Sequence, residues 1–168
     1  MSCEIRRVRR GDEGTLARVQ SESWKAAFCE ILSEADLQKY TDIGLVTGIY
    51  KKLLESGKGH GYILEAEGKA CQIAYWDGAR DHAFSNAAEI ICIHSLPDAR
   101  RKGYGSKLME RMLADIAADG YPEVILWVFE ENTDARAFYE AKGFEVTEKT
   151  QPAFGTYEIC YKKRLKEY

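Results

Sequence analysis

The sequence is poor in proline, has no paired-cysteine motif and has no long apolar run. Its 168 residues include 5 cysteines and 3 prolines. The cysteines are scattered, odd in number and form no Cys-x-x-Cys pair, which argues against a disulfide framework and against a zinc site. No apolar stretch approaches the roughly 18 residues that a membrane-spanning helix needs. We therefore expect reduced thiols, no metal ion and no membrane contact.

A strong excess of positive charge is also absent. The net charge is -3 and the isoelectric point is about 5.7, whereas a domain that binds nucleic acid is usually strongly basic. The basic residues near the N-terminus are not followed by an apolar stretch, so they do not form a secretory signal. We expect a cytoplasmic protein with no nucleic-acid partner. Local basic patches cover residues 6–10, 100–102 and 162–166. Such a patch suits a phosphorylated small molecule, and we favour this reading for residues 100–102, whereas solvated surface charge is the favoured reading of the other two.

Hydrophobic spacing predicts a single domain over residues 1–168, a length that fits one domain. Apolar residues at helical spacing predict helices over residues 11–28, 45–54, 103–119 and 133–142. Alternating or continuous apolar runs predict strands over residues 60–66, 70–76, 88–95, 124–129, 144–149 and 156–162. A right-handed strand–helix–strand crossover should make two of these strands parallel. We expect an α+β domain whose mixed, largely antiparallel sheet has six to seven strands and helices on both faces.

The segment PDARRKGYGSK, residues 97–107, carries the clearest chemical signal. A buried strand ends there, and Gly103 and Gly105 open a helix whose first N–H groups and dipole attract anions. Basic side chains precede the glycines and add neutralising charge. The P-loop pattern is absent, and a dinucleotide fingerprint would need glycine where Leu108 stands. The segment therefore predicts a pyrophosphate site of another kind.

The pattern Arg-x-x-Gly-x-Gly at residues 100–105 resembles that of the GNAT superfamily of acyl-CoA N-acyltransferases. The strand and helix around it, AEIICIHSLPDARRKGYGSKLMERML, are similar to the central motif of that superfamily. The later segment matches its pattern N-T-x-A-R-x-F-Y-E-x-x-G-F, and the close match covers about residues 88–147. The resemblance implies an N-acetyltransferase domain with acetyl-CoA as co-substrate and an amine as acceptor.

The resemblance also implies how the coenzyme would be held. Backbone N–H groups of residues 101–106 would bind the pyrophosphate, and the end of the strand would lie along the pantetheine arm. One strand N–H would polarise the thioester carbonyl. Asn132 would touch the coenzyme, cap a helix, or do both. The coenzyme-binding residues implied are Ile93, His94, Ser95, Arg100, Arg101, Lys102, Gly103, Tyr104, Gly105, Ser106, Asn132 and Tyr139.

Two residues are candidates for proton transfer. Tyr139 matches the superfamily's tyrosine that protonates the leaving thiolate, although a core aromatic is the alternative. Glu89 is the candidate base, because it is a charge in an apolar strand and lies six residues before Ser95, on the same face; a salt-bridged carboxylate is the alternative. A base is useful because holding a lysine-type amine neutral at pH 7.4 costs about 4 kcal/mol. His94 is a rival base that alternation places on the opposite face.

The acceptor site is predicted to include Trp24, Phe28 and Glu89. Aromatic residues should surround the acceptor or pack in the core, and they are Trp24, Phe28, Tyr40, Tyr50, Tyr75 and Phe154. The acceptor would be a small-molecule amine or a peptide amine, and the protein a monomer or homodimer. Two other functions stay open: a non-catalytic acyl-CoA-binding or regulatory domain, and an acyltransferase with a hydroxyl acceptor.

Overall fold

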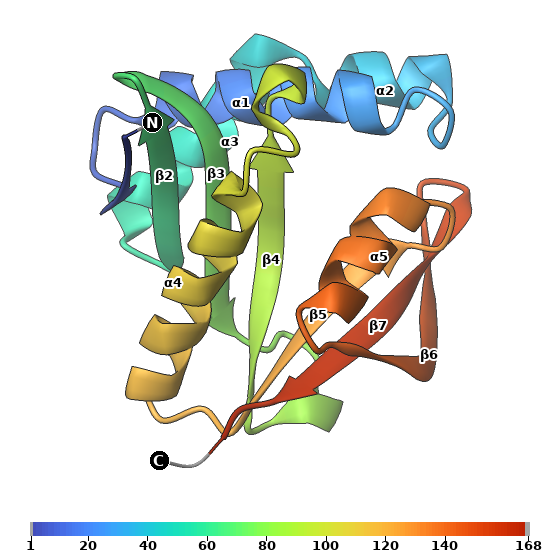
Figure 1. Cartoon of the computed structure of the whole chain (residues 1–168). Helices are drawn as coiled ribbons and strands as arrows, with labels where there is room; N and C mark the ends of the chain where they lie inside the picture. Colours follow the sequence, from blue (N-terminus) through green and yellow to red (C-terminus); the bar gives the residue numbers. More distant parts are fainter. Residues whose placement is uncertain (1, 167–168) are drawn as a thin grey trace.

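The computed structural model describes residues 2–166, which form a seven-stranded sheet with helices on both faces (Figure 1). The strand order is β1-β2-β3-β4-β5-β7-β6. β4 and β5 run parallel, and the other neighbouring pairs run antiparallel. The strands are β1 (Cys3–Arg7), β2 (His60–Ala66), β3 (Lys69–Gly78), β4 (Ala87–Ser95), β5 (Glu123–Phe129), β6 (Glu145–Ala153) and β7 (Thr156–Arg164). The predicted fold class and the parallel strand–helix–strand unit are confirmed.

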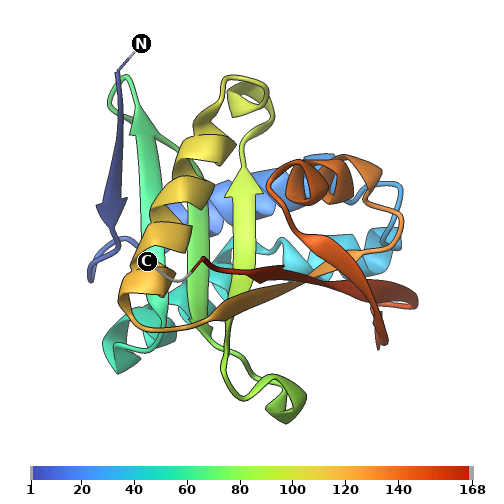
Figure 2. The same cartoon turned by 60° about the horizontal axis from the view of Figure 1, so that its bottom comes forward.

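Helices cover the two faces of the sheet unequally. Figures 1 and 2 show α1 and α3 on one face, with α2 beside α1, and α4 and α5 on the other. Two short 3-10 helices, η1 (His82–Phe84) and η2 (Pro97–Ala99), lie at the two ends of β4. None of the helices in residues 2–166 is both long and apolar enough to cross a membrane. The helices are α1 (Glu13–Ala27), α2 (Glu34–Tyr40), α3 (Ile43–Ser56), α4 (Tyr104–Ala118) and α5 (Thr133–Ala141).

The parallel pair β4–β5 divides the sheet. Residues 87–90 of β4 pair with residues 123–126 of β5, and the register goes no further. Beyond that point the two strands diverge, while β5 stays paired with β7 along its length (Figure 1). The second half of β4 therefore has a hydrogen-bonded neighbour on its β3 side alone. The divergence leaves a wedge-shaped space between the two parts of the sheet.

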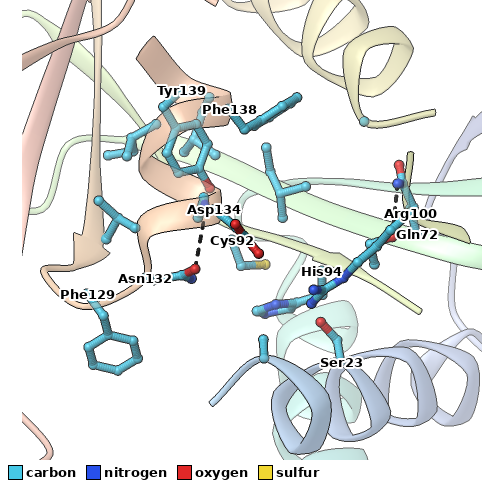
Figure 3. A pocket seen from close by; sticks show the side chains of 18 of the residues that line it. Ser23, Gln72, Cys92, His94, Arg100, Phe129, Asn132, Asp134, Phe138 and Tyr139 are labelled. Atoms are coloured by element: carbon cyan, nitrogen blue, oxygen red, sulfur yellow. Dashed lines mark hydrogen bonds between the residues drawn. The ribbon is translucent and has the colours of Figure 1, made fainter. Parts of the chain in front are cut away.

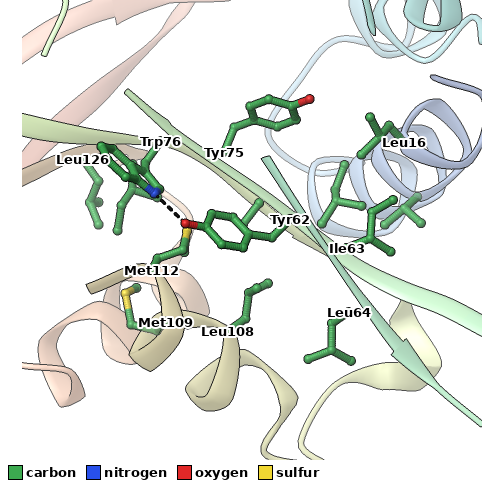
Figure 4. Close-up of a cluster of buried hydrophobic side chains, with 14 of the residues drawn as sticks. Leu16, Tyr62, Ile63, Leu64, Tyr75, Trp76, Leu108, Met109, Met112 and Leu126 are labelled. Atoms are coloured by element: carbon green, nitrogen blue, oxygen red, sulfur yellow. Dashed lines mark hydrogen bonds between the residues drawn. The ribbon is translucent and has the colours of Figure 1, made fainter. Parts of the chain in front are cut away.

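The core fixes α4 against the sheet beside this wedge. Met112 and its helical neighbours Leu108 and Met109 are fully buried and pack near Tyr62 and Trp76 (Figure 4). The Trp76 indole N–H donates to the Tyr62 hydroxyl at 2.9 Å. That hydroxyl donates to a carboxylate of α4, that of Asp115, at 2.7 Å. Because buried polar groups without partners are costly, these bonds help to set the position of α4 on the sheet.

A β-bulge interrupts β4 near its middle. Tyr75 of β3 pairs with Cys92, but the next residue, Trp76, pairs with Ile90. Ile91 is therefore the extra residue on the bulged strand. Directly paired residues of an antiparallel ladder share a face of the sheet. The bulge consequently reverses the alternation of side chains along β4.

This reversal changes which predicted site residues share a face. Glu89 pairs with Asp77 and Ser95 pairs with Gln72. Asp77 and Gln72 are five residues apart in β3, so their side chains point to opposite faces. The prediction that Glu89 and Ser95 share a face is therefore wrong, and His94 lies on the face of Glu89. A strand sequence that alternates with an uninterrupted period of two gives no sign of a bulge.

Candidate functional site

A cavity of about 620 Å³ lies where β4 and β5 diverge (Figure 3). Its size is within the range of roughly 300–1,000 Å³ typical of small-molecule sites. It is lined by α1, β4, the start of α4, β5, α5 and the β6–β7 hairpin. Most of the predicted site residues line this cavity: Trp24, Phe28, Ile93, His94, Ser95, Arg100, Arg101, Gly103, Gly105, Ser106, Asn132 and Tyr139.

The start of α4 forms one end of the cavity. Gly103 is the N-cap, and no side chain caps the first N–H groups of the helix. Arg101 and Gly103 have φ angles of 61° and 80°, and left-handed residues in such turns aim successive N–H groups at one point. A Cβ on Gly105 would lie 3.5 Å from the ring of Phe138, so the glycine leaves this backbone open. This geometry suits an anion, and anion binding at the start of α4 stays a prediction.

Two predicted residues contribute no side chain to this end of the cavity. The ring of Tyr104 is buried in the core. The Lys102 side chain is exposed and borders a separate groove, which Tyr104 also lines. Contact of these two residues with a bound anion would therefore have to come from their backbone N–H groups.

Tyr139 of α5 lines the cavity. Its ring packs against Phe138 and Phe144, with centroids 5.5 and 6.0 Å away. Burial raises the pKa of the Tyr139 phenol above its ordinary value of 10.0, so the hydroxyl keeps its proton at neutral pH. Asn132 lines the same cavity and also caps α5, because its side chain accepts from the N–H of Ala135 at 3.3 Å. The capping role is confirmed, whereas coenzyme contact stays a prediction.

Aromatic rings line the opposite end of the cavity. Trp24 and Phe28 of α1 meet Phe129 of β5 and Phe154 of the β6–β7 turn. Centroid distances around this group of four rings, which we call the aromatic wall, are 5.2, 5.0, 6.1 and 5.9 Å. Glu158 of β7 lines the same part of the cavity, and one of its oxygens accepts from the Gln151 amide at 2.8 Å.

Two aromatics predicted near the acceptor lie elsewhere. Tyr50 of α3 and Tyr75 of β3 are 5% and 3% exposed, and their ring centroids are 6.0 Å apart. Neither residue lines the cavity. They belong to the main hydrophobic core, so their predicted placement near the acceptor is wrong. The core-packing alternative describes both residues correctly.

His94 lines the cavity, and its side chain is on the face of β4 that packs against α1. The Trp24 indole N–H donates to its Nε2 atom at 3.4 Å. In the neutral ring the proton then resides on Nδ1. Burial lowers the pKa of His94 to about 4, so the imidazole is neutral at neutral pH.

Glu89 does not line the cavity, contrary to its predicted place in the acceptor site. Its side chain is 2% exposed, and its carboxylate accepts from the Arg80 backbone N–H at 3.1 Å and from Arg80 Nε at 3.2 Å. The two side chains form an ion pair, which is the alternative that the sequence left open. Glu89 therefore lies outside the cavity, paired with Arg80.

Comparison with known proteins identifies the family. Residues 21–144 match the Acetyltransferase (GNAT) family. The chain belongs to the GNAT family. A probable N-acetyltransferase of Mycobacterium tuberculosis is 28% identical over 101 residues, which cover 60% of this chain but only 55% of that relative. An uncharacterized N-acetyltransferase of Archaeoglobus fulgidus is 29% identical over 141 residues, covering 83% and 90% of the two chains.

Solved structures share the GNAT fold along the whole chain. The PaiA N-acetyltransferase of Thermoplasma acidophilum, solved in complex with coenzyme A, superimposes with a TM-score of 0.84. It is 22% identical, and the match covers 98% of this chain and 100% of that one. The acetyltransferase YncA of Salmonella typhimurium, described as putative and solved with acetyl-CoA, has a TM-score of 0.74 and 18% identity, with 100% and 96% covered.

Gln72 is a cavity residue of this GNAT domain that the sequence reading missed. It is 3% exposed, lines the cavity, and its Nε2 donates to the Ser95 hydroxyl at 3.1 Å. Its Oε1 atom is buried without a partner among the described residues. An orphaned acceptor of this kind fits a ligand N–H group. The one available signal was a polar residue inside the otherwise apolar run of β3.

Proposed function

We propose that this protein transfers an acetyl group from acetyl-CoA to a primary amine by direct attack of the amine. The observation that carries the proposal is one continuous cavity that is lined both by the start of α4 and by the aromatic wall. Tyr139, which carries the proposed acid hydroxyl, lines the same cavity. The PaiA and YncA structures, which contain coenzyme A and acetyl-CoA, support the choice of co-substrate.

The chain's own groups fit that co-substrate. The open N–H groups of residues 101–106 would bind the pyrophosphate, with charge from Arg100 and Arg101, both of which line the cavity. Residues 93–95 of β4 have no partner on the β5 side, so their backbone groups can bond the pantetheine amides. The orphaned Oε1 of Gln72 adds an acceptor there. When bound, acetyl-CoA supplies an activated acyl thioester.

Proton transfer would use groups on both sides of the thioester. Tyr139 keeps its proton at neutral pH because burial raises the pKa of its phenol, and it would give that proton to the leaving thiolate. Glu158 lines the acceptor side of the cavity, and we propose that its carboxylate holds the ammonium group of the acceptor. The ammonium group would lose one proton to solvent before the neutral amine attacks the thioester. The second proton, which the nitrogen loses as the C–S bond breaks, would restore the Tyr139 phenol. Glu89 would act as base only through a water chain past Arg80, since it does not line the cavity.

A covalent route through a cysteine has less support. Cys92 lines the cavity, but burial raises the pKa of its thiol to about 12. The thiolate is the nucleophilic form of cysteine, and at neutral pH this thiol remains protonated. Direct attack by the amine therefore agrees better with the site than an acyl-cysteine step does.

One experiment separates this proposal from its alternatives. Purified protein is incubated with acetyl-CoA and a panel of amines, thiol release is followed, and products are identified by mass spectrometry. Thermal shift with coenzyme A alone is measured in parallel. Acetylated amine in the products supports the proposal. A thermal shift without thiol release indicates a non-catalytic binder, and acetylation of an amino alcohol on oxygen indicates a hydroxyl acceptor.

A further inference from the structure

The turn between β6 and β7 holds a bulky residue in an unusual backbone conformation. Ala153 pairs with Thr156, so Phe154 and Gly155 are the two central residues of the turn. Their φ angles are 51° and 78°, and positive values at both central positions are those of a type I′ turn. Asn, Asp and Gly are favoured there, whereas a large aromatic in the left-handed region is an outlier. Backbone strain of this kind is concentrated at functional sites.

The ring of Phe154 forms part of the acceptor side of the cavity. It lines the cavity and contacts rings from three other elements. Its centroid is 4.9 Å from Tyr40 of α2, 5.9 Å from Trp24 of α1 and 6.1 Å from Phe129 of β5. The strained turn thus places an aromatic ring where α1, α2 and β5 meet. A small polar residue at position 154 would relieve the backbone strain, but it would leave this side of the cavity without an aromatic ring.

A second turn in the same chain shows the same backbone without the ring. Glu67 and Gly68 connect β2 to β3, with φ angles of 53° and 77°. The Glu67 side chain is exposed and does not line the cavity. The two turns therefore share the same left-handed backbone conformation, but of the two side chains only that of Phe154 lines the cavity. This pair separates the effect of backbone strain from the effect of the Phe154 ring.

The aromatic wall also restricts the chemistry of the acceptor. Its four rings carry a single polar group, the Trp24 indole N–H, and that group already bonds to His94. A polar carrier group buried against the wall would find no hydrogen-bond partner on these rings, which is unfavourable. An apolar carrier would instead gain contact area. The ammonium group itself has the Glu158 carboxylate in the same part of the cavity.

We infer that Phe154 is a specificity-determining residue of the acceptor site, and that the acceptor is a primary amine on an alkyl or arylalkyl carrier. The inference rests on the proposed function. Because the strained turn holds the Phe154 ring against Trp24, Tyr40 and Phe129, loss of the ring should widen this part of the cavity for an apolar group.

The test compares two amines in wild type, Phe154→Asn, Phe154→Tyr and Glu67→Asn. 2-Phenylethylamine is the slender probe and 2,2-diphenylethylamine the broad one, with acetyl-CoA as donor. Phe154→Asn should raise the ratio of kcat/KM for the broad over the slender amine by about tenfold, a usual effect of one hydrophobic contact. The change should appear in the amine KM, with the acetyl-CoA KM unchanged. Glu67→Asn and Phe154→Tyr should keep the wild-type ratio.

Asparagine suits a type I′ turn, so both Asn variants should fold; thermal melts check this, and Phe154→Leu serves as a second ring-free variant. A wild-type ratio in Phe154→Asn and Phe154→Leu overturns the specificity role. Wild-type preference for the hydrophilic 2-(2-aminoethoxy)ethanol over 2-phenylethylamine overturns the apolar carrier. Acetyl-CoA binding with no acetylated amine from any member of the panel overturns the proposed function itself.

Discussion

Replacing the glycines at the start of α4 tests the anion site most sharply. Gly103 has a φ of 80°, and a Cβ there would have no atom within 4 Å. The cost of Gly103→Ala is therefore that of the left-handed backbone alone, about 1–2 kcal/mol. For a chain of this size each 1 kcal/mol lowers Tm by about 2–4 °C, so the expected fall is about 2–8 °C. Any shift of the loop to relieve this strain would also disturb the proposed pyrophosphate site.

Gly105→Ala should separate binding from stability. Gly105 lies within α4, and its added Cβ would meet Phe138 at 3.5 Å, an ordinary contact distance. The free energy of unfolding should therefore change by no more than about 1 kcal/mol, in the stabilising direction expected for alanine in a helix. The new methyl group would nevertheless occupy the cavity beside the first N–H groups of α4. We expect the Kd for coenzyme A to rise at least about tenfold, or about 1.4 kcal/mol.

Gly120→Ala supplies the matched control for strain. Gly120 also has a positive φ, 92°, and open space around a Cβ, but it follows the other end of α4. Its Tm should fall as in Gly103→Ala while the Kd for coenzyme A stays unchanged. Thermal melts and isothermal titration with coenzyme A measure both quantities. Wild-type affinity in Gly105→Ala would refute a pyrophosphate site at the start of α4.

Three further predictions follow from the cavity. Tyr139→Phe should lower turnover by about 10²–10⁴, the range for one general acid, with the acetyl-CoA KM unchanged in steady-state kinetics. Burial lowers the pKa of His94 from 6.5 to about 4. As pH drops from 6.5 towards 4, the unfolded chain therefore binds a proton at His94 that the folded protein does not, and the free energy of unfolding should fall. His94→Gln should make the free energy of unfolding, measured in denaturant melts, less dependent on pH over this range. Glu158→Gln should raise the KM for the amine. A loss of turnover in Glu89→Gln that is reversed at high pH would instead identify Glu89 as the base.

The elements of the fold were predictable because their periods are local. Leu108, Met112 and Ile116 recur every four residues, and all three are fully buried on the sheet side of α4. The backbone geometry at the start of α4 was predictable for a related reason. It depends on consecutive residues at a strand end and a helix start, so the glycine spacing carries the necessary information. The family motifs lie in the same stretch of the chain.

The orientation of β4 side chains was not predictable in this way. The bulge at Ile91 arises from pairing with β3, which is distant in sequence, and no glycine or proline marks it. Glu89 and His94 were consequently assigned to the wrong faces relative to each other. The partner of Glu89, Arg80, lies in the connection that precedes β4. Whether Arg80 contacts Glu89 depends on how that connection folds.

Which residues line the cavity depends on where β4 and β5 diverge. Phe129 and Glu158 line it because they are paired on neighbouring strands beyond that point. Both reside in segments that read as ordinary strand from the sequence. Tyr75, by contrast, lies on β3 next to the bulge and is enclosed by α3 and the core. Sequence pattern does not give the position of a gap between strands.

The most direct test of the central claim is product analysis with acetyl-CoA and 2-phenylethylamine, using wild type and Tyr139→Phe at equal coenzyme saturation. We predict stoichiometric release of coenzyme A and N-acetylated amine by wild type, and loss of most turnover in the variant with its coenzyme affinity intact. Tight binding of acetyl-CoA with no acetylated product from this or any other amine would contradict the account.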